Sequence, residues 1–256
     1  MGDAAVIYEQ SGPVVVVTMN RPDQGNSIND QMRRDLFEAW DRFGNDDSAA
    51  VAVLTGAGSR FFCTGADLKE MAAKGEHAPP PGRAPIFGDT VHLAKPVIAA
   101  VNGMALAGGF LMAESADLCI ASETAAFGVT EARRGRGAPW ATQLTWGIPK
   151  RLMLEILMVG EPLPAERAAQ IGLVNRVVSA QDLMTEALEL ANTIARNAPL
   201  SVRAAKQMMD FMPRAAGLDA ARQFSERLWA DVYASEDALE GPRAFREGRP
   251  PVWKGH

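Results

Sequence analysis

Short hydrophobic runs alternate with amphipathic stretches along most of the chain. Asn29 is suited to cap a helix whose apolar side chains recur on one face, and Asn20 to Asp23 separates this helix from the strand before it. Strands that alternate with helices predict an α/β fold with a mostly parallel sheet. The predicted strands are Ala5 to Gln10, Val14 to Asn20, Val51 to Thr55, Pro96 to Val101, Leu118 to Ser122 and Leu173 to Val178.

Beyond Ser179 the pattern changes to helical spacing alone. Apolar residues recur at that spacing, with polar faces between them, in Gln181 to Asn197, Ser201 to Phe211 and Leu218 to Tyr233. The tail from Ser235 is short and punctuated by Pro and Gly. We therefore divide the chain into a core of residues 1–178 and a C-terminal helical region of residues 179–256.

The chain is organised around Lys95 to Asp117. A buried strand here runs into Asn102 and Gly103, then through small residues to Gly108 and Gly109, where a helix begins. Such a turn leaves free backbone N–H groups at the helix start, and these bind anions and polarised carbonyls. The plainer interpretation, that the glycines serve only tight packing, is equally compatible with this stretch alone.

A second turn of small residues, Thr64 to Asp67, also opens a short helix. We expect its backbone N–H groups to meet those of Gly108 across a shared site. The glycines before it do not complete a dinucleotide-binding fingerprint, because position 61 is phenylalanine. The following segment, Ala73 to Asp89, is rich in Pro, Gly and Ala, and we interpret it as a mobile flap.

Composition narrows the range of partners. The 256 residues are 47% hydrophobic and carry a formal charge of -5, without a block of basic residues, so nucleic acid is not an expected partner. No apolar run is long enough for a membrane span and no signal peptide is evident, which predicts a cytoplasmic protein. Cys63 and Cys119 lack metal-ligand spacing, so we expect buried free thiols and neither a metal nor a redox cofactor.

Glu131 is the candidate acid or base. Apolar and small residues flank it, so burial would raise its pKa and let it exchange protons near neutrality. The alternative is a glutamate at a helix N-terminus that interacts only with the helix dipole.

Six motifs are spread over nearly the whole chain. They are NRPDQGNSIN (20–29), FFCTGADLKEM (61–71), KPVIAAVNGMALAGG (95–109), FGVTEAR (127–133), GLVNRVV (172–178) and SEDALEGPRAF (235–245). Together, and in this order, they resemble the enoyl-CoA hydratase/isomerase, or crotonase, superfamily. The resemblance implies a ββα spiral that binds acyl-CoA, followed by a helical trimerisation region, in a homotrimer or homohexamer. Coenzyme A would enter as part of the substrate, with no tightly bound cofactor.

By this resemblance the amides of Ala66 and Gly108 form an oxyanion hole for the thioester oxygen, and Glu131 is the catalytic acid/base. Preorganised donors of this kind stabilise the enolate that forms when a proton leaves the acyl group. The residues that the resemblance places near CoA are Asn26, Ser27, Ala66, Asp67, Leu68, Phe245 and Arg249. Gly248 stands where the family commonly has a lysine.

One departure bears on the reaction. Hydratases of this family use two glutamates, and the first falls here on Leu111, while Glu114 follows one helical turn later. A single carboxylate can move a proton from one carbon to another, which favours double-bond isomerisation over addition of water. The alternatives are hydration with Glu131 alone, decarboxylation or thioester hydrolysis, and binding of a CoA thioester without turnover.

Further departures cluster beside Glu131. Thr130 replaces the usual proline, and Arg136 to Trp140 replaces a glycine-rich run. Arg136 is either a solvated charge or a partner for Glu131 or for an acidic acyl group. Trp140 either belongs to the core or shapes the acyl tunnel. The acyl chain, the pathway and the choice between trimer and hexamer are not encoded in any pattern that we find.

Overall fold

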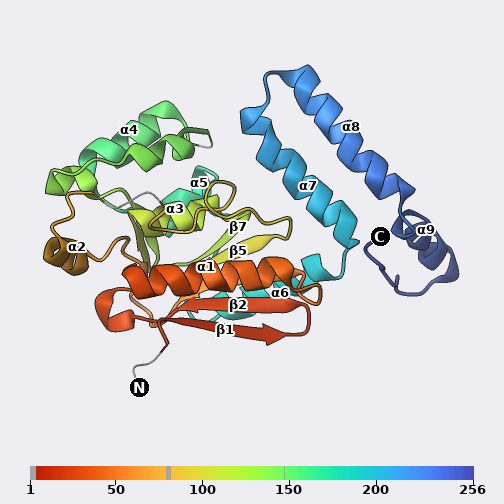
Figure 1. The fold of residues 1–256 in the computed structure, drawn as a ribbon, viewed down its shortest axis with the longest axis horizontal. Helices are drawn as coiled ribbons and strands as arrows, with labels where there is room; N and C mark the ends of the chain where they lie inside the picture. Colours follow the sequence, from red (N-terminus) through yellow and green to blue (C-terminus); the bar gives the residue numbers. More distant parts are fainter. Residues whose placement is uncertain (1–3, 79–81, 147) are drawn as a thin grey trace.

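The computed structural model describes residues 4–78, 82–146 and 148–256; residues 79–81 of the predicted flap lie outside the described residues. Its main sheet has six strands in the order β1-β2-β3-β5-β7-β10. Figure 1 labels four of them, β1, β2, β5 and β7, in that order across the sheet. The first pair is antiparallel and the others are parallel. The strands are β1 (Val6–Ser11), β2 (Val14–Met19), β3 (Val51–Gly56), β5 (Val97–Val101), β7 (Leu118–Ser122) and β10 (Arg176–Val178).

A second, four-stranded sheet has the order β4-β6-β8-β9. In each of the pairs β3–β4, β5–β6 and β7–β8, the first strand belongs to the main sheet and the second strand to the smaller sheet. A helical segment follows each pair. This repeat confirms the predicted ββα spiral. The new elements are β4 (Phe61–Cys63), β6 (Met104–Leu106), β8 (Ala126–Gly128), β9 (Leu163–Pro164), α2 (Leu68–Lys74), α3 (Gly108–Ser115) and the 3-10 turn η2 (Glu131–Arg134).

The passage from one sheet to the other depends on Asn102 and Gly103. The Asn102 side chain donates to the Gly58 carbonyl at 2.7 Å and accepts from the Gly56 amide at 3.2 Å. A Cβ at Gly103 would lie 2.4 Å from the Arg60 carbonyl oxygen, closer than any side chain can approach. These two residues therefore let the β5–β6 corner pack against the β3–β4 turn.

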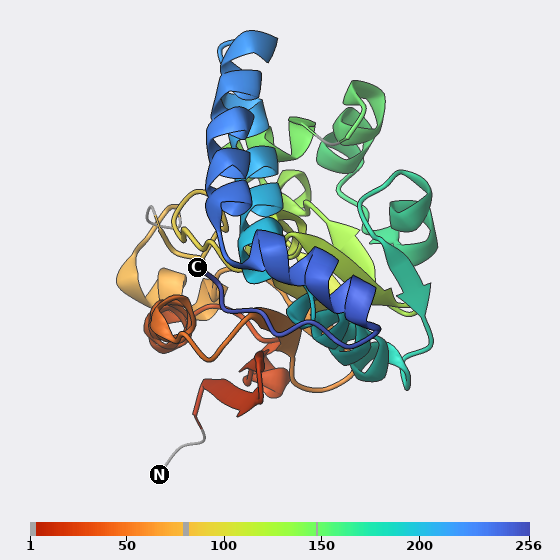
Figure 2. The ribbon, with the colours of Figure 1, turned by 90° about the vertical axis from the view of Figure 1, so that its right-hand side faces the viewer.

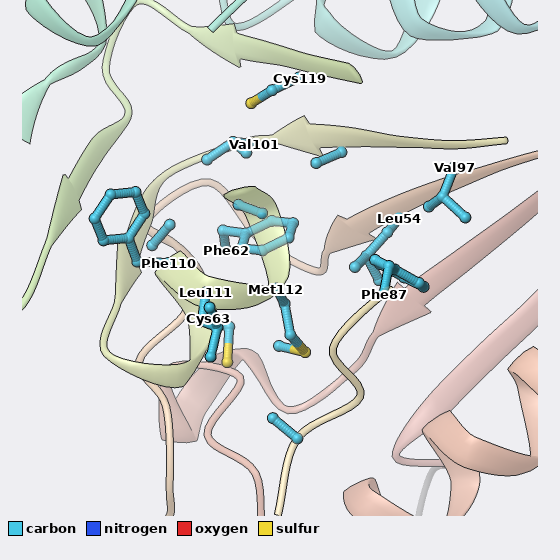
Figure 3. Close-up of a cluster of buried hydrophobic side chains, with 14 of the residues drawn as sticks. Leu54, Phe62, Cys63, Phe87, Val97, Val101, Phe110, Leu111, Met112 and Cys119 are labelled. Carbon is cyan, nitrogen blue, oxygen red and sulfur yellow. The ribbon is translucent and has the colours of Figure 1, made fainter. Parts of the chain in front are cut away.

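The core covers both faces of the main sheet. On one face, helix α1 (Asp30–Asn45) buries the apolar stripe predicted for it, and the Asn29 side chain caps it by accepting from the Met32 amide at 2.8 Å. Side chains from β4, β5 and α3 fill the space beside it, as Figure 3 shows for Phe62, Val101 and Leu111. On the other face, Val53, Ile98 and Ile120 pack with helix α6 (Leu183–Ala195), which buries Leu183, Ala187 and Ala191.

Helices α7 and α8 form a hairpin that stands beside the sheets, and Figure 2 shows the two helices lying side by side. Phe211 and Phe224 stack across the hairpin with ring centroids 4.1 Å apart. The Pro/Gly-punctuated tail contains one more helix, α9. No described helix is both long and apolar enough to cross a membrane. The remaining elements are η1 (Pro22–Gln24), η3 (Pro139–Trp146), α4 (Lys150–Val159), α5 (Ala165–Gln170), α7 (Pro199–Phe211), η4 (Met212–Arg214), α8 (Leu218–Ala234) and α9 (Asp237–Glu247).

Candidate active site

The turn before helix α3 is held in an unusual backbone conformation. Ala107 has φ 52° and ψ -122°, a region that residues with a side chain rarely adopt, and its amide donates to the Gly128 carbonyl at 2.9 Å. Such conformations persist only where the surroundings enforce them, and they cluster at functional sites. Here the turn makes Gly108 the first helical residue, so its N–H group belongs to the helix end.

The turn at Gly65 and Ala66 packs directly against this one. A Cβ at Gly65, whose φ is +86°, would lie 2.8 Å from the Ala107 Cβ and 3.1 Å from the Gly108 nitrogen. On its other side the turn pairs with Ile28, whose amide donates to the Gly65 carbonyl and whose carbonyl accepts from the Asp67 amide. Within the described residues, neither the Ala66 nor the Gly108 amide donates to an acceptor of the chain.

Both turns border one cavity of about 390 Å³. Glu131, from η2, lines the same cavity, as do Leu68 and Leu111. The structure thus brings together two small-residue turns more than forty positions apart and a carboxylate still further along the chain. Glycine at position 108 leaves the helix start open, because a Cβ there would meet nothing closer than 3.6 Å.

Glu131 is the only carboxylate among the described residues that line the cavity. Burial raises the pKa of Glu131, and hydrogen bonds from backbone amides and from the Trp140 side chain only partly oppose this effect. Its Oε2 atom is buried without a hydrogen-bond partner in the described part of the chain. A buried carboxylate oxygen that has no partner can accept or deliver a proton inside the cavity.

Leu111 stands where the resemblance places the first glutamate of the hydratases. It is 2% exposed and borders the cavity. Figure 3 shows it in the same cluster of buried side chains as Cys63. Glu114 follows one turn later on α3 and does not border the cavity. Position 111 therefore presents only methyl groups to a substrate, and Glu114 does not replace the lost carboxylate.

Three arginines line the cavity, and sequence reasoning singled out only Arg136. Arg83 is 5% exposed and its guanidinium pairs with Asp30, Glu70 and Glu76 at 3.1, 3.1 and 2.7 Å. Arg134 donates to the Thr130 hydroxyl at 3.0 Å. Arg134 could have been predicted to line the cavity, because it follows the candidate base Glu131 by three residues. No sequence pattern indicated Arg83, because its partners Asp30, Glu70 and Glu76 are scattered along the chain.

Arg136 and Trp140 were left open between two interpretations. Arg136 is half-buried, lines the cavity and donates to the His77 carbonyl at 2.8 Å, so it is neither fully solvated nor paired with Glu131. Trp140 packs against the core and borders the cavity as well.

Of the residues predicted near CoA, Ala66 and Leu68 border the cavity, whereas Asn26, Ser27 and Asp67 do not. Asn26 is fully buried, donates to the Ala57 and Phe61 carbonyls, and accepts from the Arg21 amide. Asp67 caps α2 through the Lys69 and Glu70 amides. Its second oxygen binds the Arg21 guanidinium at 3.0 Å and accepts from the Ser27 hydroxyl at 3.2 Å. These three side chains hold the turn that carries Ala66.

The pKa of the Asp67 carboxyl lies below its usual value. Burial alone would raise this pKa, but the Glu70 amide and the Arg21 guanidinium stabilise the charged form more strongly. Asp67 therefore stays ionised and remains a cap and an ion-pair partner.

Phe245 and Arg249 lie at a distance from the cavity within this chain. Phe245 is on α9 and 89% exposed, and Arg249 pairs with Glu240 and Glu247 at 2.6 and 2.7 Å. Helices α2 and α9 stand toward opposite ends of the molecule in Figure 1. A contact of these tail residues with CoA remains a prediction.

Cys63 and Cys119 are both buried free thiols, and burial raises the pKa of each to about 12. Neither is therefore a thiolate near neutrality. The described residues contain no group of three His, Cys, Asp or Glu side chains that could hold a metal ion.

The fold is a ββα spiral with a largely apolar cavity at the start of α3. The family model for enoyl-CoA hydratase/isomerase matches residues 9–256. The chain belongs to the enoyl-CoA hydratase/isomerase family, and it is an acyl-CoA enzyme.

Relatives and solved structures agree with this assignment. The carnitinyl-CoA dehydratase of Citrobacter koseri is 39% identical over 97% of this chain and 97% of its own length, and that of Proteus mirabilis is 40% identical over 95% and 96%. The crystal structure of enoyl-CoA hydratase from Mycobacterium tuberculosis H37Rv has a TM-score of 0.90 at 36% identity, covering 99% of this chain and all of that one. The structure of enoyl-CoA hydratase from Mycobacterium marinum has a TM-score of 0.91 at 38% identity, with the same coverage.

Proposed function

We propose that the protein moves the double bond of an enoyl-CoA between the 3,4 and 2,3 positions. Glu131 removes a proton from C2 of a 3-enoyl-CoA, the electrons delocalise onto the thioester oxygen, and the same carboxyl group returns the proton to C4. The observation that carries this proposal is that Glu131 is the only carboxylate among the described residues of the cavity. Its raised pKa matches a group that must both accept and release a proton.

In this proposal the Ala66 and Gly108 amides form the oxyanion hole. Support comes from the close packing of their two turns and from the lack of an acceptor for either amide in the described chain. Removing one donor of this kind typically costs about 3 kcal/mol of transition-state stabilisation. Ala66 and Leu68 would then lie along the pantetheine arm, with Asn26, Ser27 and Asp67 supporting their loop.

Hydration of a 2-enoyl-CoA is the second candidate, because the relatives are named carnitinyl-CoA dehydratase and enoyl-CoA hydratase. With leucine at position 111, Glu131 would have to orient the water and deliver the proton to carbon by itself. Leucine offers no oxygen or nitrogen to hold that water, so the geometry favours isomerisation.

The test is turnover of 2-enoyl-CoA and 3-enoyl-CoA by the wild type and by Glu131→Gln, with the products separated by chromatography. We expect the wild type to interconvert the two isomers and to form little 3-hydroxyacyl-CoA. We expect Glu131→Gln to lower kcat by about 10²- to 10⁴-fold, because the amide cannot take up the proton. Arg133→Gln, which changes an exposed neighbour outside the cavity, serves as the control.

The outcomes separate the candidates. Hydroxyacyl-CoA as the main product, lost in Glu131→Gln, would replace isomerisation by hydration. Equal turnover by wild type and Glu131→Gln would remove Glu131 as the base.

A further inference from the structure

Only one of the three arginines that line the cavity forms ion pairs with carboxylates of the described chain. Three arginines line it, and the carboxylates of Asp30, Glu70 and Glu76 neutralise Arg83. Arg134 and Arg136 form no ion pair with another described residue, and their hydrogen bonds go to a neutral hydroxyl and a neutral carbonyl. Two positive charges therefore border an otherwise largely apolar cavity in which Glu131 is the only described carboxylate.

Both arginines belong to the segment that carries Glu131. Arg134 lies on the same 3-10 turn, and the Arg136 amide donates to the Glu131 carbonyl at 3.0 Å. The charge of Arg134 also reaches the Glu131 carboxyl, whose pKa it helps to lower against the dominant effect of burial. Arg134 and Arg136 thus follow the proton-transfer group on one segment, and both line the same cavity as Glu131. The amides of Ala66 and Gly108 belong to other turns.

We propose that Arg134 and Arg136 select acyl-CoA substrates whose acyl chain ends in a carboxylate and reject those whose chain ends in a cation. This inference rests on the proposed function, which directs the acyl chain from the two amides toward Glu131. A guanidinium has five N–H donors, so a carboxylate can bind without displacing the Thr130 or His77 oxygen. A quaternary ammonium would instead meet two like charges, and water screens the half-buried Arg136 less than the exposed Arg134.

Binding of saturated acyl-CoAs tests the inference without turnover. Dissociation constants would be measured by calorimetry for glutaryl-CoA and adipyl-CoA, for pentanoyl-CoA and hexanoyl-CoA, for 4-(trimethylammonio)butanoyl-CoA and for CoA itself. We expect the wild type to bind a diacid thioester about tenfold more tightly than the neutral thioester of equal length. We expect the cationic thioester to bind more weakly than pentanoyl-CoA.

Three variants locate the effect. Arg134→Gln and Arg136→Gln should each remove most of the preference for the diacid while leaving the affinity for hexanoyl-CoA within about twofold. Unchanged affinity for the neutral thioester also reports that the variant is folded. Arg133→Gln, exposed and outside the cavity, should keep the wild-type preference.

Two results would overturn the inference. One is a wild type that binds neither diacid more tightly than its neutral counterpart. The other is an equal loss of affinity for CoA itself in the arginine variants, which would assign these side chains to the phosphates of CoA. Because no thioester in this set carries a double bond, neither result depends on whether the enzyme isomerises or hydrates.

Discussion

Glu131 and Glu114 are both partly buried glutamates, but only one borders the cavity. Glu114 lies on α3, and no hydrogen bond or ion pair to its side chain is found in the described part of the chain. Burial raises its pKa from 4.5 to about 7. The folded state therefore holds the Glu114 proton more tightly than the unfolded state does. The contribution of this residue to stability is most favourable at low pH and falls as the pH rises from about 4.5 to about 7.

We expect Glu114→Gln to raise the free energy of unfolding by about 2 kcal/mol at pH 8 and to change it little at pH 4.5. The amide has nearly the same shape and no ionised form, so the penalty for burying a charge disappears. Urea denaturation at the two pH values measures the difference. Glu155→Gln, an exposed change on α4, is the control, and equal effects of the two substitutions would refute the assignment.

At the scale of elements, the predicted flap is tied to helices α1 and α2. Phe87 packs edge-on against Trp40 of α1 with ring centroids 4.9 Å apart. Arg83 joins Asp30 at the start of α1 to Glu70 on α2. These contacts hold residues 82–89 against the cavity, so the described part of the flap has its own anchors despite its content of Pro, Gly and Ala.

We expect Arg83→Met to lower the free energy of unfolding by about 2 kcal/mol, because it leaves partly buried carboxylates without their counter-charge. Amide hydrogen exchange in residues 82–89 should accelerate, and the KM for acyl-CoA should rise. Lys74 belongs to the same cluster of charges, and its side chain is 38% exposed. Lys74→Met should therefore lower the free energy of unfolding by less than about 1 kcal/mol. Unchanged exchange in residues 82–89 of Arg83→Met would show that the ion pairs do not hold the flap.

For the whole molecule, the C-terminal helices expose apolar side chains. Side chains on α7, α8 and α9 are exposed there, among them Met209, Leu218, Tyr233, Leu239 and Phe245. A single soluble chain rarely leaves so many large apolar side chains uncovered in one region. We propose that copies of the chain associate through these helices as a trimer or a pair of trimers.

Light scattering after size-exclusion chromatography tests this association. We expect the wild type to have a mass three or six times the 27.4 kDa of one chain. A double variant, Leu218→Glu with Tyr233→Glu, should shift the protein toward the single-chain mass, because charged side chains resist burial at an interface. Met158→Glu, an exposed apolar position on α4, should leave the mass unchanged. A wild type of single-chain mass would contradict the proposal.

Local sequence patterns were sufficient to predict an element wherever it depends on the spacing of apolar residues or on small residues in a turn. The stripe of α1 and its Asn29 cap, the buried runs that became β3, β5 and β7, and the glycine turn before α3 were all predicted, because each depends on neighbours a few residues away. The segment Ala126–Gly128 is a strand that is missing from the predicted ones, since its pairing partners β6 and β9 are distant in sequence.

The sequence by itself determined the alternation of strands and helices and the chemistry that a glutamate at position 131 and a leucine at position 111 can perform, because side-chain type and short-range order carry that information. The ββα repeat followed only from the resemblance to a known family. Only the tertiary structure decided which groups share the cavity. It placed Arg83 and Arg134 in its lining, left Asn26 and Asp67 to support a turn, and kept Phe245 away within one chain. These outcomes depend on contacts between segments tens to hundreds of residues apart, which no local pattern encodes.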